Sequence, residues 1–451
     1  MAMEMQQVAV IGAGWAGCSA AVELTQAGHQ VTLFEASRQL GGRARRVDIN
    51  ETILDNGQHI LLGAYRETLQ MMRKVGIDPA SVMLRLPLQM CYPADSGGMT
   101  FVAPRLPAPL HLLAALLRAD GLERQDKLAL ARFSSAARWM GWQLHDDCSV
   151  STLLERFDQT ERLVRLMWRP LCIAALNTPP EQASAQVFLA VLRDSLGARR
   201  SASDMLLPRT DLSNLFPQQA AAFIEERGGN VESGHSIRQL QRRGERWQLQ
   251  GSEASMDFDA VVIATPPETA ATLLDGCADA ALLATLRGFD YEPITTCYLQ
   301  YPAATRLPRP FFALLDDPGN AGGSAAWGQF VFDRGQLDAA QAGLLAVVIS
   351  TSSEAIQAGH EALAKAVAAQ LATAFRQPQL ASPAWTQVIS EKRATFACTP
   401  GLARPANDTG LGKLLLAGDY TASDYPATLE SAVRSGRQAA QELLAQIREA
   451  R

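Results

Sequence analysis

The stretch Val8-Ala9-Val10-Ile11-Gly12-Ala13-Gly14-Trp15-Ala16-Gly17 decides the fold of this chain of 451 residues. Its glycines have the spacing GxGxxG and follow an apolar run, Gln7 to Ile11, that predicts a strand. The stretch from Ser19 to Ala27 predicts a helix, and Val31 to Glu35 predicts a second strand. A strand, a helix and a strand in this order form a βαβ unit, which predicts an α/β, Rossmann-like fold that binds a dinucleotide.

Glu35 ends the second strand, where an acidic side chain can reach a ribose 2′-hydroxyl. In the glycine run, Gly12 allows the tight turn, Gly14 lets the backbone approach a pyrophosphate, and Gly17 lets helix and strand pack closely. The positive end of the helix dipole faces the phosphates. A glycine turn without a ligand is the alternative. The contacts expected from this unit are Gly12, Gly14, Trp15, Ala16, Gly17, Glu35 and Ala36.

The composition excludes several classes of protein. A hydrophobic share of 47% suits two or three packed domains. The net charge of -5, without a local basic and aromatic run, argues against a nucleic-acid partner. Seven scattered cysteines without a CxxC pair favour a reducing cytoplasm over a disulfide framework. The six histidines lack metal-ligand spacing, so no metal is expected.

Membrane contact, if present, is expected to be peripheral. No signal peptide is expected before Val8, because the first strand starts almost at once. No segment has the roughly 20 apolar residues that span a bilayer.

The dinucleotide domain is predicted in three pieces, because strands of its type recur far downstream. The run 259–267 predicts a buried parallel strand that ends at Thr265 and two prolines. The run 413–419 predicts another, followed by a loop and a packed terminal helix from about Pro426. An α+β substrate domain is inserted between the pieces. The predicted boundaries are 1–93, 213–276 and 401–451 for the dinucleotide domain, and 94–212 and 277–400 for the substrate domain.

The two insertions differ in character. The first is predicted to be mainly helical, with a helix start marked by the capping box Thr178-Pro179-Pro180-Glu181. The second has strand-like runs at 294–301, 327–332 and 344–350, for which we expect a mixed sheet over the cofactor.

The stretch 106–117, between Arg105 and Arg118, is apolar on nearly all faces. Three interpretations compete for it. It is a core helix, the wall of a lipid-binding tunnel, or a monotopic patch that dips into a bilayer with its arginines at the level of the head groups.

Further residues resemble those of a flavoprotein superfamily. Gly41-Gly42-Arg43 follows Glu35 within one short loop, and this placement resembles amine oxidases and carotenoid desaturases, in which the arginine lies near the FAD diphosphate. A surface arginine after a turn is the alternative. The stretch 228–237 is similar to the segment that contacts adenine in these proteins, although alone it predicts an ordinary strand after a turn. The resemblance implies FAD as cofactor, with contacts from Gly42, Arg43, Ile237 and Thr265.

Three longer stretches, 55–65, 168–181 and 417–430, resemble the hydroxysqualene dehydroxylase family, and the resemblance covers essentially the whole chain. Asp-Asn-Gly-Gln-His at 55–59 and Leu-Asn-Thr-Pro-Pro-Glu at 176–181 are its most specific parts. The resemblance implies that the first stretch lies near the isoalloxazine ring. It also implies that the N–H groups at the start of the terminal helix face the pyrimidine end of the flavin and stabilise its anionic reduced form. Further contacts implied are Gly57, Gln58, His59, Gly418, Asp419, Ala427 and Thr428.

The resemblance implies a reductive reaction. The allylic alcohol hydroxysqualene loses its hydroxyl as water and gains a hydride from reduced FAD, which yields squalene in bacterial hopanoid synthesis. Such chemistry needs an acid for the departing hydroxide, a nearby hydride donor and an apolar pocket that excludes water. Candidates for the acid are His59, Asp424 and Tyr425. Alternatively, His59 is a structural histidine near the cofactor, and Tyr420 and Tyr425 are aromatic walls of a lipid tunnel.

Three other functions stay open. An oxidative isoprenoid desaturase would share the fold and the tunnel but would move hydride towards FAD. An amine oxidase usually carries a lysine on a middle strand of the substrate domain, and none of the five lysines lies between Ile294 and Phe332. A non-catalytic lipid carrier would bind isoprenoids without a change in the flavin. Because the sequence has a single dinucleotide fingerprint, the electrons are expected to come from NAD(P)H or a redox partner. The expected location of the protein is the cytoplasm, in peripheral contact with the inner membrane.

Overall fold

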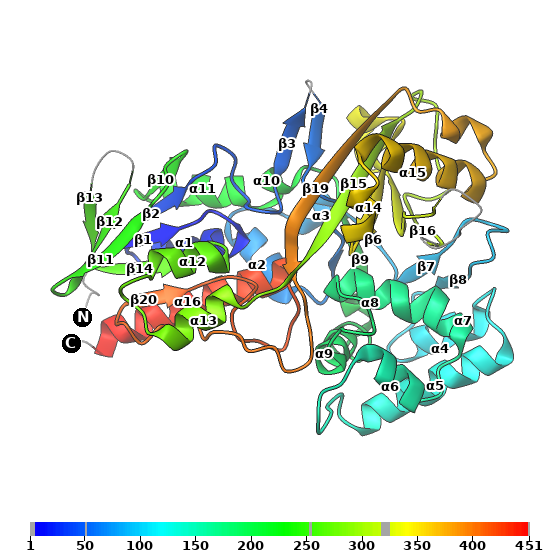
Figure 1. The fold of residues 1–451 in the computed structure, drawn as a ribbon, viewed down its shortest axis with the longest axis horizontal. Helices are drawn as coiled ribbons and strands as arrows, with labels where there is room; N and C mark the ends of the chain where they lie inside the picture. The colour runs from blue at the N-terminus through cyan, green and yellow to red at the C-terminus, as the bar shows by residue number, and fades with distance from the viewer. Residues whose placement is uncertain (1–4, 50–51, 252–254, 317–324, 450–451) are drawn as a thin grey trace.

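The glycine run follows β1, the central strand of a five-stranded sheet (Figure 1). The computed structural model describes residues 5–49, 52–251, 255–316 and 325–449. The strand order is β10-β2-β1-β14-β20, and every pair is parallel. The buried parallel strands predicted within 259–267 and 413–419 are thereby confirmed. The strands are β1 (Gln7–Ile11), β2 (Gln30–Glu35), β10 (Asn230–Ser233), β14 (Ala260–Ile263) and β20 (Leu414–Leu416).

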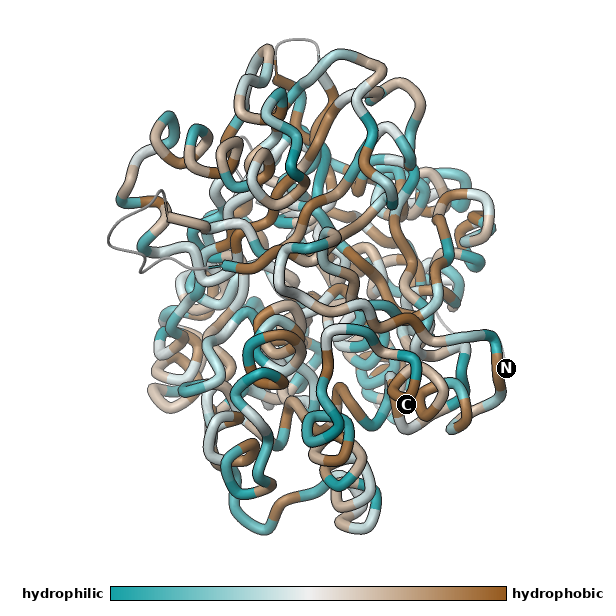
Figure 2. The backbone as a smooth tube through the Cα atoms, turned by 90° about the vertical axis from the view of Figure 1, so that its right-hand side faces the viewer, coloured by the Kyte–Doolittle hydropathy of each residue, from teal (hydrophilic) through white to brown (hydrophobic). Residues whose placement is uncertain are grey.

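Both faces of this sheet are packed against other elements. Successive side chains of each strand point to opposite faces, and the apolar side chains on each face are buried. Val8 and Val10 pack in one apolar cluster with α1 (Trp15–Gln26), α11 (Pro217–Glu225) and α16 (Leu429–Glu449). Ile11 belongs to the cluster on the other face, which includes residues of α12 (Pro267–Leu273) and of an antiparallel meander. Figure 2 shows hydrophobic stretches running through the interior of the molecule. The meander strands are β11 (Gln239–Arg243), β12 (Arg246–Gln250) and β13 (Ser255–Phe258).

Two helices of this domain begin elsewhere than predicted. Helix α1 starts at Trp15 rather than Ser19, since the N–H of Cys18 already donates to Gly14 O at 2.9 Å. Helix α16 starts at Leu429, so the prediction that Pro426 lies in its first turn is wrong. The hydroxyl of Thr428 accepts from the N–H of Ser431 at 3.2 Å and caps the helix, which leaves Pro426 in the preceding loop.

The second large sheet has the order β16-β17-β18-β15-β19 and is antiparallel at every pair. The prediction of a mixed sheet is therefore wrong. Strands β16, β17 and β18 follow one another along the chain and are neighbours in the sheet, whereas β15 pairs with β18 and β19, which lie further along the sequence. Helix α15 (His360–Ala374) packs on one face of the sheet, and the other face looks towards the first domain. The strands are β15 (Tyr291–Gln300), β16 (Phe311–Ala313), β17 (Phe330–Asp333), β18 (Leu344–Ser350) and β19 (Trp385–Phe396).

The first insertion is mainly helical, as expected from its sequence (Figure 1). Its last long helix begins at Ala185, because the hydroxyl of Ser184 caps it by accepting from Val187 N at 3.1 Å. The capping box predicted at 178–181 is wrong. Thr178 instead precedes two prolines that hold the chain extended, and its hydroxyl accepts from Cys398 N at 2.9 Å. The helices are α4 (Leu110–Arg118), α5 (Arg124–Trp139), α6 (Val150–Arg156), α7 (Glu161–Leu163), α8 (Arg169–Leu176) and α9 (Ala185–Ser195), with a π-helix at Val164–Trp168.

The apolar stretch 106–117 is not a core helix, which corrects one of its three interpretations. Helix α4 lies at the surface, where Leu110, Leu113 and Leu117 are 53%, 51% and 67% exposed. Its inner face buries only His111, Ala115 and Leu116. None of the described helices combines the length and apolar character needed to cross a bilayer.

Smaller elements connect the two domains. Strand β9 (Met205–Pro208), from the end of the first insertion, pairs with β5 (Leu61–Leu62) and β6 (Met83–Leu86) of the first piece. Helix α13 (Ala280–Arg287) packs against α12, so residues up to 287 stay with the dinucleotide domain and the substrate sheet starts at β15. The remaining elements are α2 (Arg66–Lys74), α3 (Pro79–Val82), α10 (Leu212–Leu215), α14 (Ser353–Gln357), β3 (Arg46–Ile49), β4 (Thr52–Asp55), β7 (Gln89–Cys91) and β8 (Thr100–Val102).

Candidate active site

One continuous cavity of about 990 Å³ runs from the glycine turn to the helices of the substrate domain. This volume lies at the upper end of the range of roughly 300–1,000 Å³ typical of small-molecule sites. Of the residues predicted to bind the cofactor, only Gly17 does not line it. The predicted residues that line it are Gly12, Gly14, Trp15, Ala16, Glu35, Ala36, Gly42, Arg43, Gly57, Gln58, His59, Ile237, Thr265, Gly418, Asp419, Ala427 and Thr428.

The glycine turn has the close contacts that its spacing predicted. Gly12 adopts a φ of +104°, and a Cβ there would lie 2.6 Å from Ala264 O. A Cβ on Gly17 would lie 1.8 Å from Gly12 O, so this residue serves the packing of helix against strand. Around Gly14 the nearest atom to such a Cβ is Gly42 Cα at 3.9 Å, which leaves the backbone open to the cavity.

Glu35 lies at the carboxyl end of β2, and one of its carboxylate oxygens contacts the glycine turn. Its Oε2 accepts from Ala13 N at 2.8 Å, and its Oε1 accepts from Ser37 N at 2.9 Å. A carboxylate offers about four acceptor positions, so the two oxygens can still receive hydroxyl donors from the cavity. These acceptor oxygens fit the hydroxyl groups at the ribose end of a dinucleotide.

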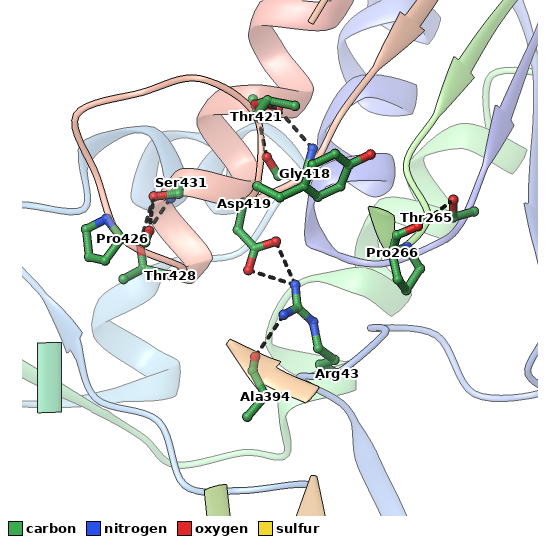
Figure 3. A network of polar contacts seen from close by, with 12 residues as sticks. Arg43, Thr265, Pro266, Ala394, Gly418, Asp419, Thr421, Pro426, Thr428 and Ser431 are labelled. Carbon is green, nitrogen blue, oxygen red and sulfur yellow. Dashed lines mark hydrogen bonds and ion pairs between the residues drawn. The ribbon is translucent and has the colours of Figure 1, made fainter. Parts of the chain in front are cut away.

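Arg43 and Asp419 join the first and last pieces of the dinucleotide domain (Figure 3). Arg43 Nη2 donates to both oxygens of Asp419 at 2.7 Å, and Nη1 donates to Ala394 O at 2.8 Å. The Asp419 side chain is 9% exposed, whereas that of Arg43 is 38% exposed and lines the cavity. Arg43 is therefore held in place by two separate segments, the loop that carries Asp419 and strand β19, while part of its guanidinium stays available to a ligand.

The loop after β4 lies between the two domains. Asn56 Nδ2 donates to Arg43 O at 2.9 Å and to Glu391 Oε2 at 3.0 Å. Gln58 Nε2 donates to Tyr298 OH at 2.8 Å, so both the first and the second domain position this loop. Burial lowers the pKa of His59 to about 4, and the imidazole is uncharged at neutral pH. His59 is thus placed at the site but lacks the charge of a strong proton donor.

The apolar arm of the cavity lies between the antiparallel sheet and the helices. Phe311 stacks on Phe330 with ring centroids 5.5 Å apart and contacts Phe332 at 5.2 Å. Ile294 and Val348 line the same cavity from β15 and β18. These side chains offer an apolar ligand a wall without hydrogen-bonding groups.

A polar pair lies where this arm meets the dinucleotide cleft. The hydroxyl of Tyr425, in the loop before α16, donates to Oδ2 of Asp194 on α9, and both residues line the cavity. Burial, followed by the bond to Asp194, raises the pKa of Tyr425. Burial opposes ionisation of Asp194, yet the hydrogen bonds from Arg193 and Tyr425 hold its pKa below the usual value. The guanidinium of Arg434 lies 4.3 Å from the centre of the Tyr425 ring.

Asp424, predicted as a possible acid, is exposed and does not line this cavity. That prediction is wrong, because the loop turns its side chain to solvent and directs that of the adjacent Tyr425 inward. Sequence reasoning missed Asp194 and Arg434, since no local motif marks residues that meet only when α9 approaches the terminal loop. Among the described residues, no group of three or more His, Cys, Asp or Glu side chains is arranged to hold a metal ion.

Comparisons with known proteins agree with this geometry. The family described as flavin containing amine oxidoreductase matches residues 15–444. A hydroxysqualene dehydroxylase of Rhodopseudomonas palustris is 33% identical over 97% of this chain and 98% of its own length. A zeta-carotene desaturase of Synechocystis is 24% identical over 97% of each chain. The solved structure of a cyclohexylamine oxidase of Brevibacterium oxydans shares the fold, with a TM-score of 0.67 and 17% identity over 99% of this chain and all of its own.

The Rossmann-like cleft, the coverage of the family match and the near full-length relatives lead to one assignment. The protein is a flavin-dependent oxidoreductase with an inserted substrate domain. The chain belongs to the flavin-containing amine oxidoreductase family and, within it, to the group formed by the hydroxysqualene dehydroxylases.

Proposed function

We propose that the protein binds FAD and uses it to remove the hydroxyl group of hydroxysqualene reductively, forming squalene. The chain is 33% identical to a hydroxysqualene dehydroxylase and 24% identical to a zeta-carotene desaturase. This difference supports the dehydroxylase reaction over the desaturase reaction. The observation that carries the proposal is the pair of Tyr425 and Asp194, which places a phenol hydroxyl and its carboxylate partner on the wall of the cavity.

The chemistry explains why such a pair is needed. The carbon–oxygen bond breaks as the hydroxyl oxygen takes up a proton and leaves as water, because hydroxide itself is a poor leaving group. FAD, when bound and reduced, supplies the hydride that the carbon gains. Tyr425 is protonated at neutral pH, since its pKa is raised. Arg193 and Arg434 lie beside the pair and stabilise the negative charge that remains once the proton has left.

We assign the proton to Tyr425 rather than to His59. The pKa of His59, about 4, leaves its imidazole neutral at physiological pH. The role proposed for His59 is to shape the loop beside the cofactor. The apolar arm holds the isoprenoid chain through Phe311 and Phe330 and excludes water that would recapture an allylic cation.

Two of the rival functions have less support. The five lysines are all in the described part of the chain, and none lines the cavity, which disfavours an amine oxidase. A desaturase would not need a proton donor for a leaving hydroxyl, which disfavours the oxidative direction. Because the described residues form one dinucleotide unit, the electrons are proposed to come from NAD(P)H or from a redox partner.

The test is a single turnover without oxygen. The bound flavin is reduced, hydroxysqualene is added, and the oxidised-flavin absorbance is followed while the lipid is extracted. We expect reoxidation together with stoichiometric squalene. Flavin that stays reduced would contradict the proposal, and bleaching of the oxidised enzyme by a saturated isoprenoid would establish a desaturase instead. A carrier would respond in neither direction.

A further inference from the structure

Exposed apolar side chains are concentrated in one region of the described structure. Nine large apolar residues are exposed among the described residues, and six of them lie between positions 106 and 139. On α4, Leu110, Leu113 and Leu117 recur at helical spacing on the outer side. On α5, Leu128 and Trp139 are 64% and 90% exposed. We call this region the α4–α5 face, made of Leu106, Leu110, Leu113, Leu117, Leu128 and Trp139.

The two helices present this face together. The ammonium group of Lys127 near the start of α5 donates to Leu117 O at the end of α4, at 3.1 Å. Leu128, Arg132 and Trp139 follow one another at intervals of four and seven residues, so they share one side of α5. The face therefore combines leucines and a tryptophan with a cation between them.

Basic residues surround the α4–α5 face in a chain that is acidic overall. The segment 105–139 contains six Lys or Arg and three acidic residues, while the whole chain carries a net charge of -5. One of the three acids, Asp126, is buried and bonded to Glu123 N and Thr160. In the described part of the chain, no ion pair involves the four exposed arginines that form the basic rim, Arg105, Arg118, Arg124 and Arg132.

The cavity reaches the surface at this face. Leu113 and Leu116 of α4 line it from one side, and Leu130 and Ser135 of α5 from the other. Leu113 and Ser135 are also exposed to solvent. The cavity wall therefore includes exposed side chains of both helices, beside the leucines.

We propose that the α4–α5 face docks on an anionic lipid bilayer and that the gap between α4 and α5 is the portal through which an apolar substrate enters the cavity. The leucines and Trp139 enter the boundary between head groups and acyl chains, and the arginines of the basic rim contact lipid phosphates. A second copy of the chain is a poorer occupant, because a symmetric contact would bring two basic rims together. The proposal that the face docks on a bilayer is independent of the proposed function, whereas the proposal that the gap is a substrate portal rests on it.

Flotation with vesicles tests the docking. The patch variant Leu110→Ser/Leu117→Ser/Leu128→Ser/Trp139→Ser changes four residues that do not line the cavity. The control Ile53→Ser/Trp385→Ser changes residues that are 41% and 37% exposed on β4 and β19. Each holoprotein is mixed with phosphatidylcholine vesicles with or without phosphatidylglycerol, and its flavin content and thermal unfolding are compared with those of the wild type.

We expect the wild type and the control to float with vesicles that contain phosphatidylglycerol, and less so at high salt, because salt screens the arginines. The patch variant, with flavin content unchanged, should bind at least about tenfold more weakly. A wild type that does not float, or a patch variant that floats equally well, overturns the docking. A patch variant that floats equally well but turns a dimer into a monomer assigns the face to a second copy instead.

The portal is tested by comparing two forms of the same substrate. Hydroxysqualene is supplied either within vesicles or dispersed in detergent. The patch variant should turn over the vesicle substrate about tenfold more slowly than the wild type and the detergent substrate at an unchanged rate. Equal rates on the vesicle substrate overturn the portal. If the wild type turns over neither form, the proposed function fails and the portal with it, while flotation still decides the docking.

Discussion

Replacement of Glu35 by alanine tests the cofactor cleft most directly. Its carboxylate accepts from Ala13 N and Ser37 N at 2.8 and 2.9 Å and lines the ribose end of the cavity. The change removes the charged acceptor proposed for the ribose hydroxyls of FAD. It also leaves the N–H of Ala13 without this partner, so part of the effect will be a loosened glycine turn.

The size of the effect follows from the kind of hydrogen bond. A hydrogen bond to a charged group contributes about 1.5–3 kcal/mol. Its loss should raise the dissociation constant of FAD by about 10- to 150-fold, because 1.4 kcal/mol corresponds to a factor of ten. The variant Glu35→Gln keeps a neutral acceptor and should raise the dissociation constant less, by about threefold to twelvefold, since charge-assisted bonds are about twice as strong as neutral ones.

The assay is reconstitution of the apoprotein with FAD, followed by the quenching of flavin fluorescence. Glu232→Ala is the matched control, because Glu232 is an exposed acid on the adjacent strand β10 and does not line the cavity. Unfolding of each apoprotein in urea measures the contribution of the turn separately. A Glu35→Ala protein that binds FAD within twofold of the wild type would refute the role given to this carboxylate.

Three further predictions concern the rest of the site. Arg43→Met leaves the buried Asp419 without its partner, so the free energy of unfolding in urea should fall by about 1–3 kcal/mol, and a loss below about 0.5 kcal/mol would contradict this. His59 has a pKa of about 4 when folded and 6.5 as a free side chain, so stability is lost as the pH falls from 6.5 towards 4, because only the unfolded imidazole takes up a proton. In urea unfolding measured at a series of pH values, His59→Gln should remove up to about 3 kcal/mol of this acid-induced loss of stability. If the free energy of unfolding of the variant depends on pH as steeply as that of the wild type, the low pKa of His59 is not the cause. Tyr425→Phe should lower kcat by about 100- to 10,000-fold with little change in KM or flavin content. The control Tyr301→Phe removes a phenol that donates to Leu380 O and does not line the cavity, so its kcat should stay at the wild-type value. Equal effects of the two changes on kcat would argue for a structural role of Tyr425.

The sequence predicted those elements that depend on interactions between residues close together in the chain. The strands around the glycine run follow from short apolar runs, and the conformation of Gly12 follows from the tight turn that its spacing requires. Helix starts were less predictable, because several side chains compete to cap one helix. Ser184 caps α9 although Thr178 has the better local pattern, since two prolines hold the chain after Thr178 extended.

The antiparallel order of the second sheet could not be derived from its strands. Strand-like runs such as 344–350 specify burial, but not the direction of their neighbours. The position of α4 was undecided for a similar reason. An apolar stretch has the same sequence pattern whether the protein covers it or it faces solvent. Only the packing of the folded chain shows that its leucines are exposed.

The sequence by itself determined the dinucleotide unit, its acidic residue Glu35 and the pieces in which the first domain recurs, because each depends on the spacing of neighbouring residues. The tertiary structure alone decided which distant groups meet. It brought Arg43 against Asp419 and Tyr425 against Asp194, and it directed Asp424 to solvent. The physical reason is that a hydrogen bond or ion pair depends on a separation of about 3 Å in space, which residues hundreds of positions apart acquire only when their domains pack.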